Sequence, residues 1–138
     1  MKLVNFLEND AYSLANAENQ NLFLAIKYNE VVGYIFYKKV SLVATDFYSH
    51  LNYDRTDIDL SSFFAFEVEY LYVKSSQRNK GLGKMLISKV IEDYYLESNA
   101  LIIELWALKS AVNFYKKFNF KDNLDDNSQP VSTYMYLE

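Results

Sequence analysis

The sequence predicts an α/β fold with a mixed sheet, and two observations support this prediction. Runs of apolar, β-branched and aromatic residues of strand length alternate with segments whose apolar residues recur at helical spacing. Between residues 63 and 96, a strand-like run, a glycine-containing turn and a helical stripe follow one another directly. At 138 residues and 51% hydrophobic content, the chain is expected to form a single domain, residues 1–138, with a substantial core.

The composition excludes several classes of protein and site. A net charge of −4 argues against a nucleic-acid-binding protein, which needs a basic face. The absence of cysteine excludes disulfides and thiolate sites, and a single histidine, His50, excludes a histidine cluster, so no metal is expected. No apolar run reaches the roughly 18 residues of a membrane span, and the start lacks the apolar core of a signal peptide. We therefore expect a soluble cytoplasmic protein without a membrane partner.

The first 20 residues are predicted to form a short strand and then a helix. Residues 2–7 fit the strand, which is the weaker of the two patterns. Asp10 is a good N-cap for a helix over residues 11–19, because its carboxylate can accept a hydrogen bond from the first helical turn.

A β-hairpin is predicted next. Residues 22–28 and 31–37 are apolar, β-branched and aromatic, and Asn29-Glu30 between them fits a tight turn. Gly33 lies inside the second strand, where a glycine predicts a bulge or a close approach of another backbone.

Residues 38–62 are predicted to be a long connection, because no clear period emerges there. Connections of this length are often functional. A solvated insertion without a role is the alternative, and the sequence leaves both open. The segment is acidic, with Arg55 as its one arginine against four aspartates: Asp46, Asp54, Asp57 and Asp59.

Residues 63–73 form the clearest strand of the sequence. With a period of two, alternate side chains share a face of the sheet. One face is predicted to carry Glu67, Glu69, Leu71 and Val73. The other is predicted to carry Phe66, Val68, Tyr70 and Tyr72.

The remaining elements are predicted from residue 86 onward. A helical stripe runs through Leu86, Ile87, Val90, Ile91 and Tyr94, and residues 100–106 read as a second buried strand. A short helix is predicted over residues 110–118 with Ser110 as its N-cap. Asn119 then fits the left-handed conformation that ends a helix. Two closing strands are predicted at 118–121 and 131–137.

The turn between the strand at 63–73 and the following helix has the features of an anion site. Two of the three glycines lie here, and residues 73–89 hold five basic residues and no acidic one. N–H groups at the start of a helix have no intrahelical acceptor, and the helix dipole adds a positive end. The pattern is Arg78-x-x-Gly81-x-Gly83. It lacks the Gly-Lys-Ser/Thr of a P-loop and the third glycine of a dinucleotide-binding fold.

This loop resembles the pyrophosphate loop of the GNAT (Gcn5-related) N-acetyltransferases, and residues 107–120 resemble the second signature of that family, which centres on Tyr115. The resemblance covers nearly the whole chain. It implies a GNAT-type mixed sheet of about six to seven strands with three to four helices. The sequence departs from the family at Leu108, where the family has Asn, and at Asn119, where it has Gly. Its front end also has room for one helix where the family usually has two.

The resemblance also implies that acetyl-CoA is the co-substrate. Its pantetheine would pair with the backbone of Leu71, Tyr72 and Val73, and the N–H of Leu71 could hold the thioester oxygen. Ser110, Asn113 and Lys116 would contact the pantetheine or the 3′-phosphate end. The pyrophosphate would lie on the N–H groups of the loop: Arg78, Asn79, Lys80, Gly81, Leu82, Gly83 and Lys84.

The implied reaction is direct attack of an amine on the acetyl group. An alkylammonium has a pKa of about 10.4 and must lose a proton first, and Glu67 or Glu69 is the candidate base. Tyr115 matches the family tyrosine that protonates the departing thiolate. For each of these residues, an ordinary place on the surface or in the core is the alternative reading.

The acceptor amine is not identified by the sequence. If the acidic residues 46–59 cover the site, a small cationic amine or a peptide amine is favoured. Two other functions stay open: a non-catalytic acyl-CoA-binding module, and an interaction domain with an aromatic surface. The aromatic-rich strand at 131–137 could pair with a second copy, so a homodimer is also an open alternative.

Overall fold

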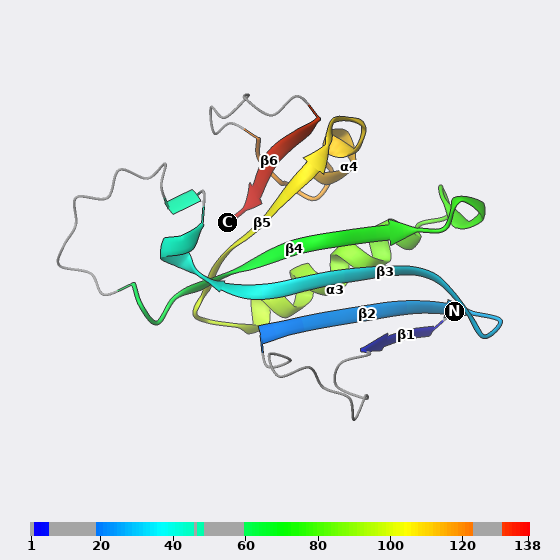
Figure 1. The fold of residues 1–138 in the computed structure, drawn as a ribbon, viewed down its shortest axis with the longest axis horizontal. Coiled ribbons are helices and arrows are strands. Elements are labelled where there is room, and N and C mark those ends of the chain that lie inside the picture. Colours follow the sequence, from blue (N-terminus) through cyan, green and yellow to red (C-terminus); the bar gives the residue numbers. More distant parts are fainter. Residues whose placement is uncertain (1, 6–18, 46, 49–59, 123–130) are drawn as a thin grey trace. The chain divides into compact units, whose positions relative to one another are not determined.

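The computed structural model describes residues 2–5, 19–45, 47–48, 60–122 and 131–138. Their strands are β1 (Lys2–Asn5), β2 (Gln20–Lys27), β3 (Glu30–Ser41), β4 (Phe64–Val73), β5 (Ala100–Leu108) and β6 (Ser132–Leu137). The α-helices are α3 (Leu82–Leu96) and α4 (Val112–Lys116), and 3₁₀ turns occur at η2 (Leu42–Ala44), η3 (Ser75–Gln77) and η4 (Lys109–Ala111) (Figure 1).

The strands form one six-stranded sheet in the order β1-β2-β3-β4-β5-β6. The pairs β1–β2, β2–β3 and β5–β6 are antiparallel. The helix α3 connects β4 to its neighbour β5, a crossover that joins parallel strands. The predicted α/β class with a mixed sheet is therefore confirmed. The described residues contain two α-helices, fewer than the three to four predicted, and the helix predicted at 11–19 lies outside them except for its last residue.

The chain divides into two compact units. The first unit comprises Met1–Lys39 and Val68–Leu96, and the second comprises Val40–Glu67 and Glu97–Glu138. The strands β3 and β4 pass from one unit into the other. Each unit has its own packing, so each is described by itself.

The hairpin of the first unit turns one residue earlier than predicted. Lys27 pairs with Glu30, which leaves Tyr28 and Asn29 as the two turn residues. Both have positive φ, 52° and 61°, as the type I′ turn of a two-residue hairpin requires. The predicted turn Asn29-Glu30 is therefore wrong by one position. Tyr28 is 92% exposed, so its ring does not have to reach the core from this turn.

Gly33 marks both a bulge and a close backbone approach, as the sequence predicted. The register moves from Ala25↔Gly33 to Ile26↔Val31, so Val32 is an extra residue on β3. A Cβ atom on Gly33 would lie 2.8 Å from the carbonyl oxygen of Tyr72 and 3.1 Å from Cδ2 of Leu82. Only a glycine fits between β4 and α3 here without a shift of backbone.

We expect Gly33→Ala to destabilise the protein by roughly 1–3 kcal/mol, because the added methyl group would overlap a backbone oxygen that cannot rotate away. The midpoint of urea unfolding measures this loss. Val31→Thr, an isosteric change at a 44% exposed position of the same strand, is the control. Equal midpoints for Gly33→Ala and the control would show that β4 moves aside without cost.

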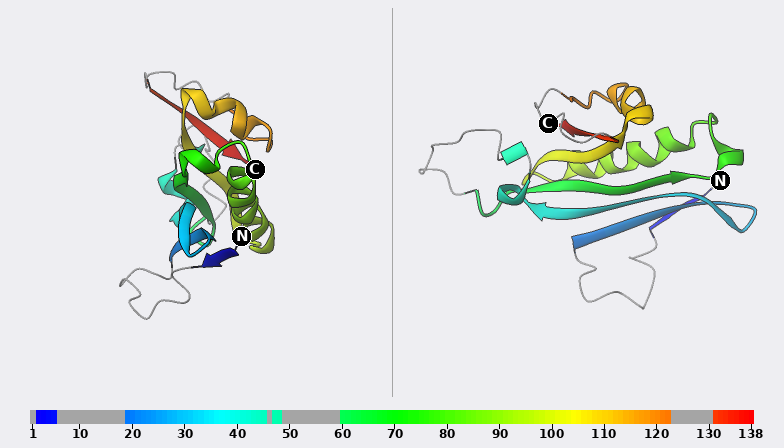
Figure 2. Two further views of the ribbon diagram at one scale, coloured as in Figure 1. Left: turned by 90° about the vertical axis from the view of Figure 1, so that its right-hand side faces the viewer. Right: turned by 45° about the horizontal axis from the view of Figure 1, so that its top comes forward.

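The helix α3 covers one face of the sheet in the first unit, and the edge-on view of Figure 2 shows it along one side of the strands. Its buried residues are Leu82, Leu86, Ile87 and Val90, which confirms the predicted helical stripe in its inner part. The Tyr37 hydroxyl of β3 donates a hydrogen bond to Asp93 of α3. Lys89 of α3 lies 5.2 Å from the ring centroid of Phe23 on β2.

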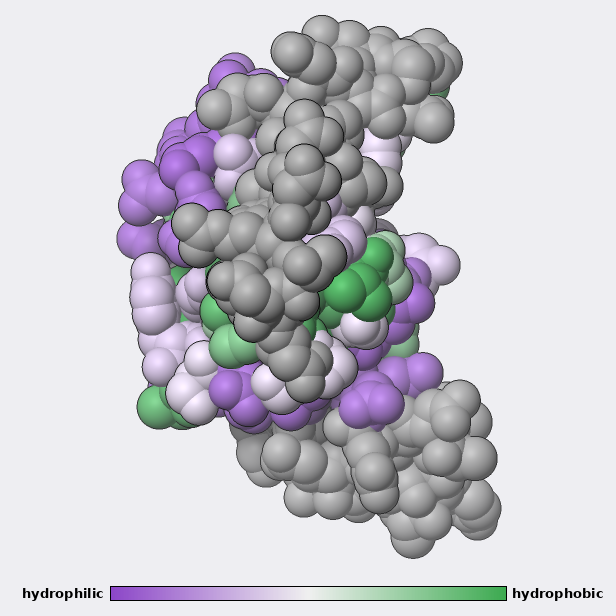
Figure 3. Space-filling view, turned by 90° about the vertical axis from the view of Figure 1, so that its left-hand side faces the viewer, coloured by the Kyte–Doolittle hydropathy of each residue, from purple (hydrophilic) through white to green (hydrophobic). Residues whose placement is uncertain are grey.

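The second unit has a core in which η2 packs against the sheet. Leu42, Ala65 and Ile102 form a buried cluster, and the partly buried Val40, Phe47, Leu60 and Phe63 pack against it. The predicted long connection at 38–62 is therefore structured at both ends, because β3 continues to Ser41 and Leu42 donates its N–H to the Phe63 carbonyl at 3.3 Å. Apolar side chains that reach the surface form compact green patches among hydrophilic residues in Figure 3.

Two predictions near the C-terminus are wrong in detail. The helix predicted at 110–118 is a 3₁₀ turn, η4, followed by α4, and Ala111 precedes α4 without a side-chain cap, so Ser110 is not its N-cap. The strand predicted at 118–121 is a single bridge between Lys121 and Tyr136. The helix end is confirmed, because Asn119 has a φ of 70°.

The outer edge of β6 is occupied at one point. Lys121 and Tyr136 exchange both backbone hydrogen bonds, at 2.8 and 3.0 Å. A second copy could not pair with β6 at this position without displacing Lys121. The homodimer stays a prediction.

No helix among the described residues is long and apolar enough to cross a membrane. The cytoplasmic location stays a prediction.

Candidate active site

The glycine loop after β4 has amides that are available to an anion. Asn79 and Gly81 have left-handed backbones, with φ of 62° and 81°. The first intrahelical hydrogen bond of α3 runs from the Met85 N–H to the Gly81 carbonyl at 3.0 Å. The N–H groups of Leu82, Gly83 and Lys84 therefore precede the helical ladder and point out of its N-terminal end. A turn of this kind followed by a helix start is an anion-binding arrangement.

Arg78 differs from the other loop residues in how it can act. Its backbone N–H is directed at the Ser75 carbonyl at 3.4 Å. Its Nε donates to the carbonyl of Val73 at 3.1 Å, which holds the guanidinium beside the end of β4. Arg78 would therefore meet an anion with its side chain rather than with its amide.

Positive charge on the loop is not neutralised by the part of the chain that the structure describes. Among the residues that the structure describes, no carboxylate pairs with the exposed Arg78, Lys80 or Lys84. Lys74, by contrast, forms an ion pair with Glu30. Three cations beside unpaired amides, in a protein of net charge −4, provide a site for a multiply charged anion.

The strand β4, which leads into the loop, departs from the predicted alternation. The rings of Tyr70 and Tyr72 contact those of Phe36 and Tyr34, with centroids 6.3 and 5.5 Å apart. Tyr34 follows Gly33, which faces α3, so these rings lie on the opposite face.

Glu69 reaches that same face. It forms an ion pair with Lys38 at 2.7 Å, and Lys38 is two residues beyond Phe36 on β3. Since Glu69 and Tyr70 are neighbours in the chain, a regular strand could not place both on one face. We infer an interruption of the pleat at Glu69–Tyr70, as in a β-bulge. The predicted division of β4, with Glu69 and Tyr70 on opposite faces, is corrected accordingly.

The helix α4 presents a buried tyrosine. Tyr115 is 7% exposed and packs edge-on against Phe114 and Phe120, with centroids 5.1 and 5.7 Å away. Burial raises the pKa of Tyr115 to about 12, because the phenolate loses hydration there. No residue in the described parts of the chain hydrogen-bonds the Tyr115 hydroxyl, which is free to donate.

The other residues predicted on this side lie on the surface of the second unit. Ser110 and Asn113 are exposed. Lys116 is exposed and forms an ion pair with Asp122 at 3.2 Å. A phosphate at Lys116 would compete with this carboxylate.

The comparison with protein families decides the family. A model described as an acetyltransferase (GNAT) domain matches residues 18–122, about three quarters of the chain.

The chain belongs to the GNAT acetyltransferase family.

Solved structures agree with the GNAT fold. Arabidopsis thaliana NAA60 in complex with acetyl-CoA is 17% identical, with a TM-score of 0.67 over 86% of this chain and 75% of that one. Escherichia coli ElaA is 19% identical, with a TM-score of 0.63 over 96% and 76%. Arabidopsis thaliana Naa50 in complex with the bisubstrate analogue CoA-Ac-MVNAL is 21% identical, with a TM-score of 0.58 over 83% and 70%. A comparison with curated protein sequences finds no match.

The predicted GNAT site residues divide between the two units. The first unit holds Glu69, Leu71, Tyr72 and Val73 together with the loop residues from Arg78 to Lys84. The second holds Glu67, Ser110, Asn113, Tyr115 and Lys116. Within the first unit, the strand end and the loop are continuous, and the guanidinium of Arg78 joins them. The roles assigned to all these residues stay predictions.

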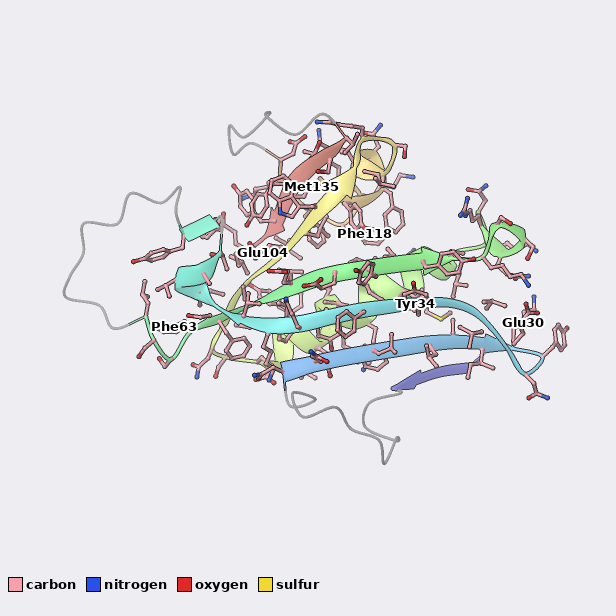
Figure 4. The ribbon with its side chains drawn as sticks, in the orientation of Figure 1. Glu30, Tyr34, Phe63, Glu104, Phe118 and Met135 are labelled. Carbon is pink, nitrogen blue, oxygen red and sulfur yellow. The ribbon has the colours of Figure 1, made fainter. Side chains whose placement is uncertain are left out.

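Glu104 of this GNAT domain was missed by the sequence reasoning. It lies in the middle of β5 and is 5% exposed, and it accepts a hydrogen bond from the Tyr134 hydroxyl at 2.5 Å (Figure 4). The sequence does indicate this residue, because Glu104 is the single charged residue in the apolar run at 100–106 and has to be buried with the strand. No group of metal ligands occurs among the described residues.

Proposed function

We propose that this protein is an N-acetyltransferase that transfers the acetyl group of acetyl-CoA directly to an amine, either a small cationic amine or a peptide amine. The observation that carries the proposal is the loop from Arg78 to Lys84, where left-handed residues, helix-start amides and unpaired cations come together. This combination suits the diphosphate of coenzyme A. Family membership supports an acetyl-CoA-dependent acyltransferase in general.

The structures of related proteins support the same co-substrate and the same class of acceptor. NAA60 is described in complex with acetyl-CoA, and Naa50 in complex with the bisubstrate analogue CoA-Ac-MVNAL. In this chain, pantetheine would pair with the backbone at Leu71, Tyr72 and Val73. Lys80 and Lys84 would meet the phosphate oxygens.

Glu67 is the better candidate for the general base. Glu69 is held by Lys38 at 2.7 Å, and its protonation would break that ion pair. Glu67 is half-buried on β4. It lies two residues after Ala65, so the pleat directs it to the face on which Ala65 packs with Leu42 and Ile102.

The proposed activity is tested with acetyl-CoA and a panel of alkyl, polyamine and peptide amines. The release of free coenzyme A, measured with a thiol reagent, should depend on both the protein and the amine. Isothermal calorimetry with acetyl-CoA alone separates the alternatives. Binding without turnover of any amine would indicate a non-catalytic acyl-CoA module, and absence of binding would indicate an interaction domain.

We expect Glu67→Gln to lower kcat by about 100-fold or more, the usual contribution of a general base, and Glu69→Gln to lower it by less than about fivefold. Residual turnover by Glu67→Gln should rise with pH, because the free-amine fraction grows about tenfold per pH unit below the amine pKa of about 10.4. The pH profile of kcat/KM measures this. A larger loss in Glu69→Gln than in Glu67→Gln would reverse the assignment.

A further inference from the structure

A carboxylate surrounded by aromatic rings lies on one face of the second unit. Glu104 and Trp106 are two residues apart on β5, and they pair with Tyr136 and Tyr134 on β6. Residues opposite one another in an antiparallel pair share a face, so all four side chains lie on the same side. Met135 pairs with Leu105 and therefore belongs to the other face; Figure 4 labels it beside Glu104.

The rings are in contact with one another and with the segment after η2. The Trp106 and Tyr134 centroids are 5.4 Å apart, edge to face, and Phe47 lies 5.0 Å from Tyr136. The Phe47 N–H donates to the Tyr134 hydroxyl at 3.2 Å, and that hydroxyl donates to Glu104. Phe47, Tyr134 and Glu104 thus form one hydrogen-bonded chain that fixes the position of the carboxylate.

We propose that Glu104, Trp106 and Tyr134 form a subsite that binds the alkylammonium group of the acceptor before its deprotonation. The proposal rests on the proposed function and names the chemistry of its acceptor: a primary amine that arrives as a cation. A carboxylate attracts an ammonium by charge, and the faces of tryptophan and tyrosine attract it through their quadrupoles. Trp106 is 42% exposed, so the cluster reaches solvent beside the buried carboxylate.

Stability alone is a poor explanation for this arrangement. Replacing a buried ion pair, or both partners of a buried hydrogen bond, by well-packed apolar residues is often neutral or stabilising. Ile102, two residues before Glu104 and on the same face of β5, is a buried aliphatic residue, so an aliphatic side chain suits this face. A carboxylate kept in place by the Tyr134 hydroxyl is in contrast pre-organised to meet a cation.

The subsite and the candidate base share a face of the second unit. Ile102, which precedes Glu104 by two residues, packs in one cluster with Ala65, which precedes Glu67 by two residues. By the pleat of each strand, Glu104 and Glu67 both point to the side of that cluster. One carboxylate can therefore hold the incoming cation and the other can receive its proton.

Trp106 is the only tryptophan of the chain and provides a direct test. The full-length protein is titrated with n-butylammonium chloride while tryptophan fluorescence is recorded, with sodium chloride and 1-butanol as controls for ionic strength and shape. We expect a saturable change with the ammonium alone. The dissociation constant should rise at least tenfold in Glu104→Gln, and the exposed Glu138→Gln should match the wild type.

Kinetics supply a second readout. In Glu104→Gln, KM for a cationic amine should rise at least tenfold while KM for acetyl-CoA stays within twofold. If that variant does not fold, Tyr134→Phe, which keeps the ring and removes the hydroxyl, should weaken n-butylammonium binding at least threefold. Unchanged ammonium affinity in the folded variants, or an equal response to 1-butanol, would overturn the proposal. Calorimetry with acetyl-CoA reports cofactor binding at the loop from Arg78 to Lys84. A failure of the proposed function would therefore be detected separately from a failure of the ammonium subsite.

Discussion

Gly81→Asp is expected to abolish acetyl-CoA binding and to leave the fold intact. A Cβ atom on Gly81 would meet no atom within 4 Å, so the free protein has space for a side chain there. The φ of 81° is left-handed, a region that Asp and Asn tolerate better than most residues. The added carboxylate would face the phosphates, and each pair of charges at ~5 Å costs roughly 1–3 kcal/mol between the limits of water and protein surface. Two phosphate charges at this cost therefore predict at least about a 30-fold loss of affinity.

Gly81→Asn is the matched control, because it has the same shape without the charge. Among the described residues, Asn29, Asn79 and Asn119 already have positive φ. Isothermal calorimetry with acetyl-CoA should give an affinity for Gly81→Asn between those of the wild type and Gly81→Asp, and thermal midpoints should show that both variants fold. Binding by Gly81→Asp within twofold of the wild type would remove the loop from the cofactor site.

The features that the sequence predicted well depend on short stretches of chain. A glycine at positive φ before a helix, a strand that ends in basic residues, and Asn119 after the last helical turn are all set by local conformational preference. Gly33 is another such feature, because a glycine within a strand usually marks a bulge or the close approach of another backbone. Its partner across the sheet, the carbonyl of Tyr72, could not be named from the sequence.

The features that the sequence predicted wrongly depend on neighbours in space. Period two predicts the faces of β4 as far as Glu69. There, the ion pair of Glu69 with Lys38 and the ring contact of Tyr70 with Phe36 indicate that the alternation breaks. When a strand has no glycine or proline, its sequence does not indicate where a residue is inserted or the pleat is distorted. Likewise, a serine suggests an N-cap at Ser110, but the 3₁₀ turn η4 moves the start of the helix to Val112.

Glu104 illustrates the same limit at the candidate site. Its position in an apolar run predicts burial, but the groups that make burial tolerable lie 30 residues further along the chain, at Tyr134. Only the pairing of β5 with β6 brings the hydroxyl to the carboxylate. A lone charged residue in a predicted core strand therefore indicates a buried polar partner or a functional site, even when the sequence does not identify the partner.

Tyr115→Phe is the second change with a large expected effect. The proposed role of this phenol is to donate a proton to the departing thiolate of coenzyme A. Burial raises its pKa to about 12, so full transfer to a thiolate of pKa about 8.5 is uphill by about 5 kcal/mol. We therefore expect Tyr115 to act mainly as a hydrogen-bond donor that stabilises the developing thiolate, with water completing the protonation.

Loss of this donor should lower kcat by about 10- to 100-fold, the range for a hydrogen bond that strengthens in the transition state. The ring packing against Phe114 and Phe120 would be kept, so the affinity for acetyl-CoA should stay within twofold. Single-turnover release of coenzyme A measures the first quantity and calorimetry the second. Tyr95→Phe, at a 72% exposed position of α3, controls for the loss of a surface phenol. Full turnover in Tyr115→Phe would exclude the acid role.

The raised pKa of Tyr115 also predicts a difference in stability at high pH. The phenol titrates near pH 10 in the unfolded chain and at about 12 in the folded one, so its contribution is complete below pH 10 and is lost between pH 10 and 12, as the unfolded state releases its proton first. The full difference is about 3 kcal/mol. Over this range, the urea-derived free energy of unfolding should therefore fall more steeply for the wild type than for Tyr115→Phe, since the other tyrosines are common to both. Parallel curves would mean that the hydroxyl is hydrated in the folded protein, and a hydrated phenol would be a stronger acid toward the thiolate than the buried one proposed above.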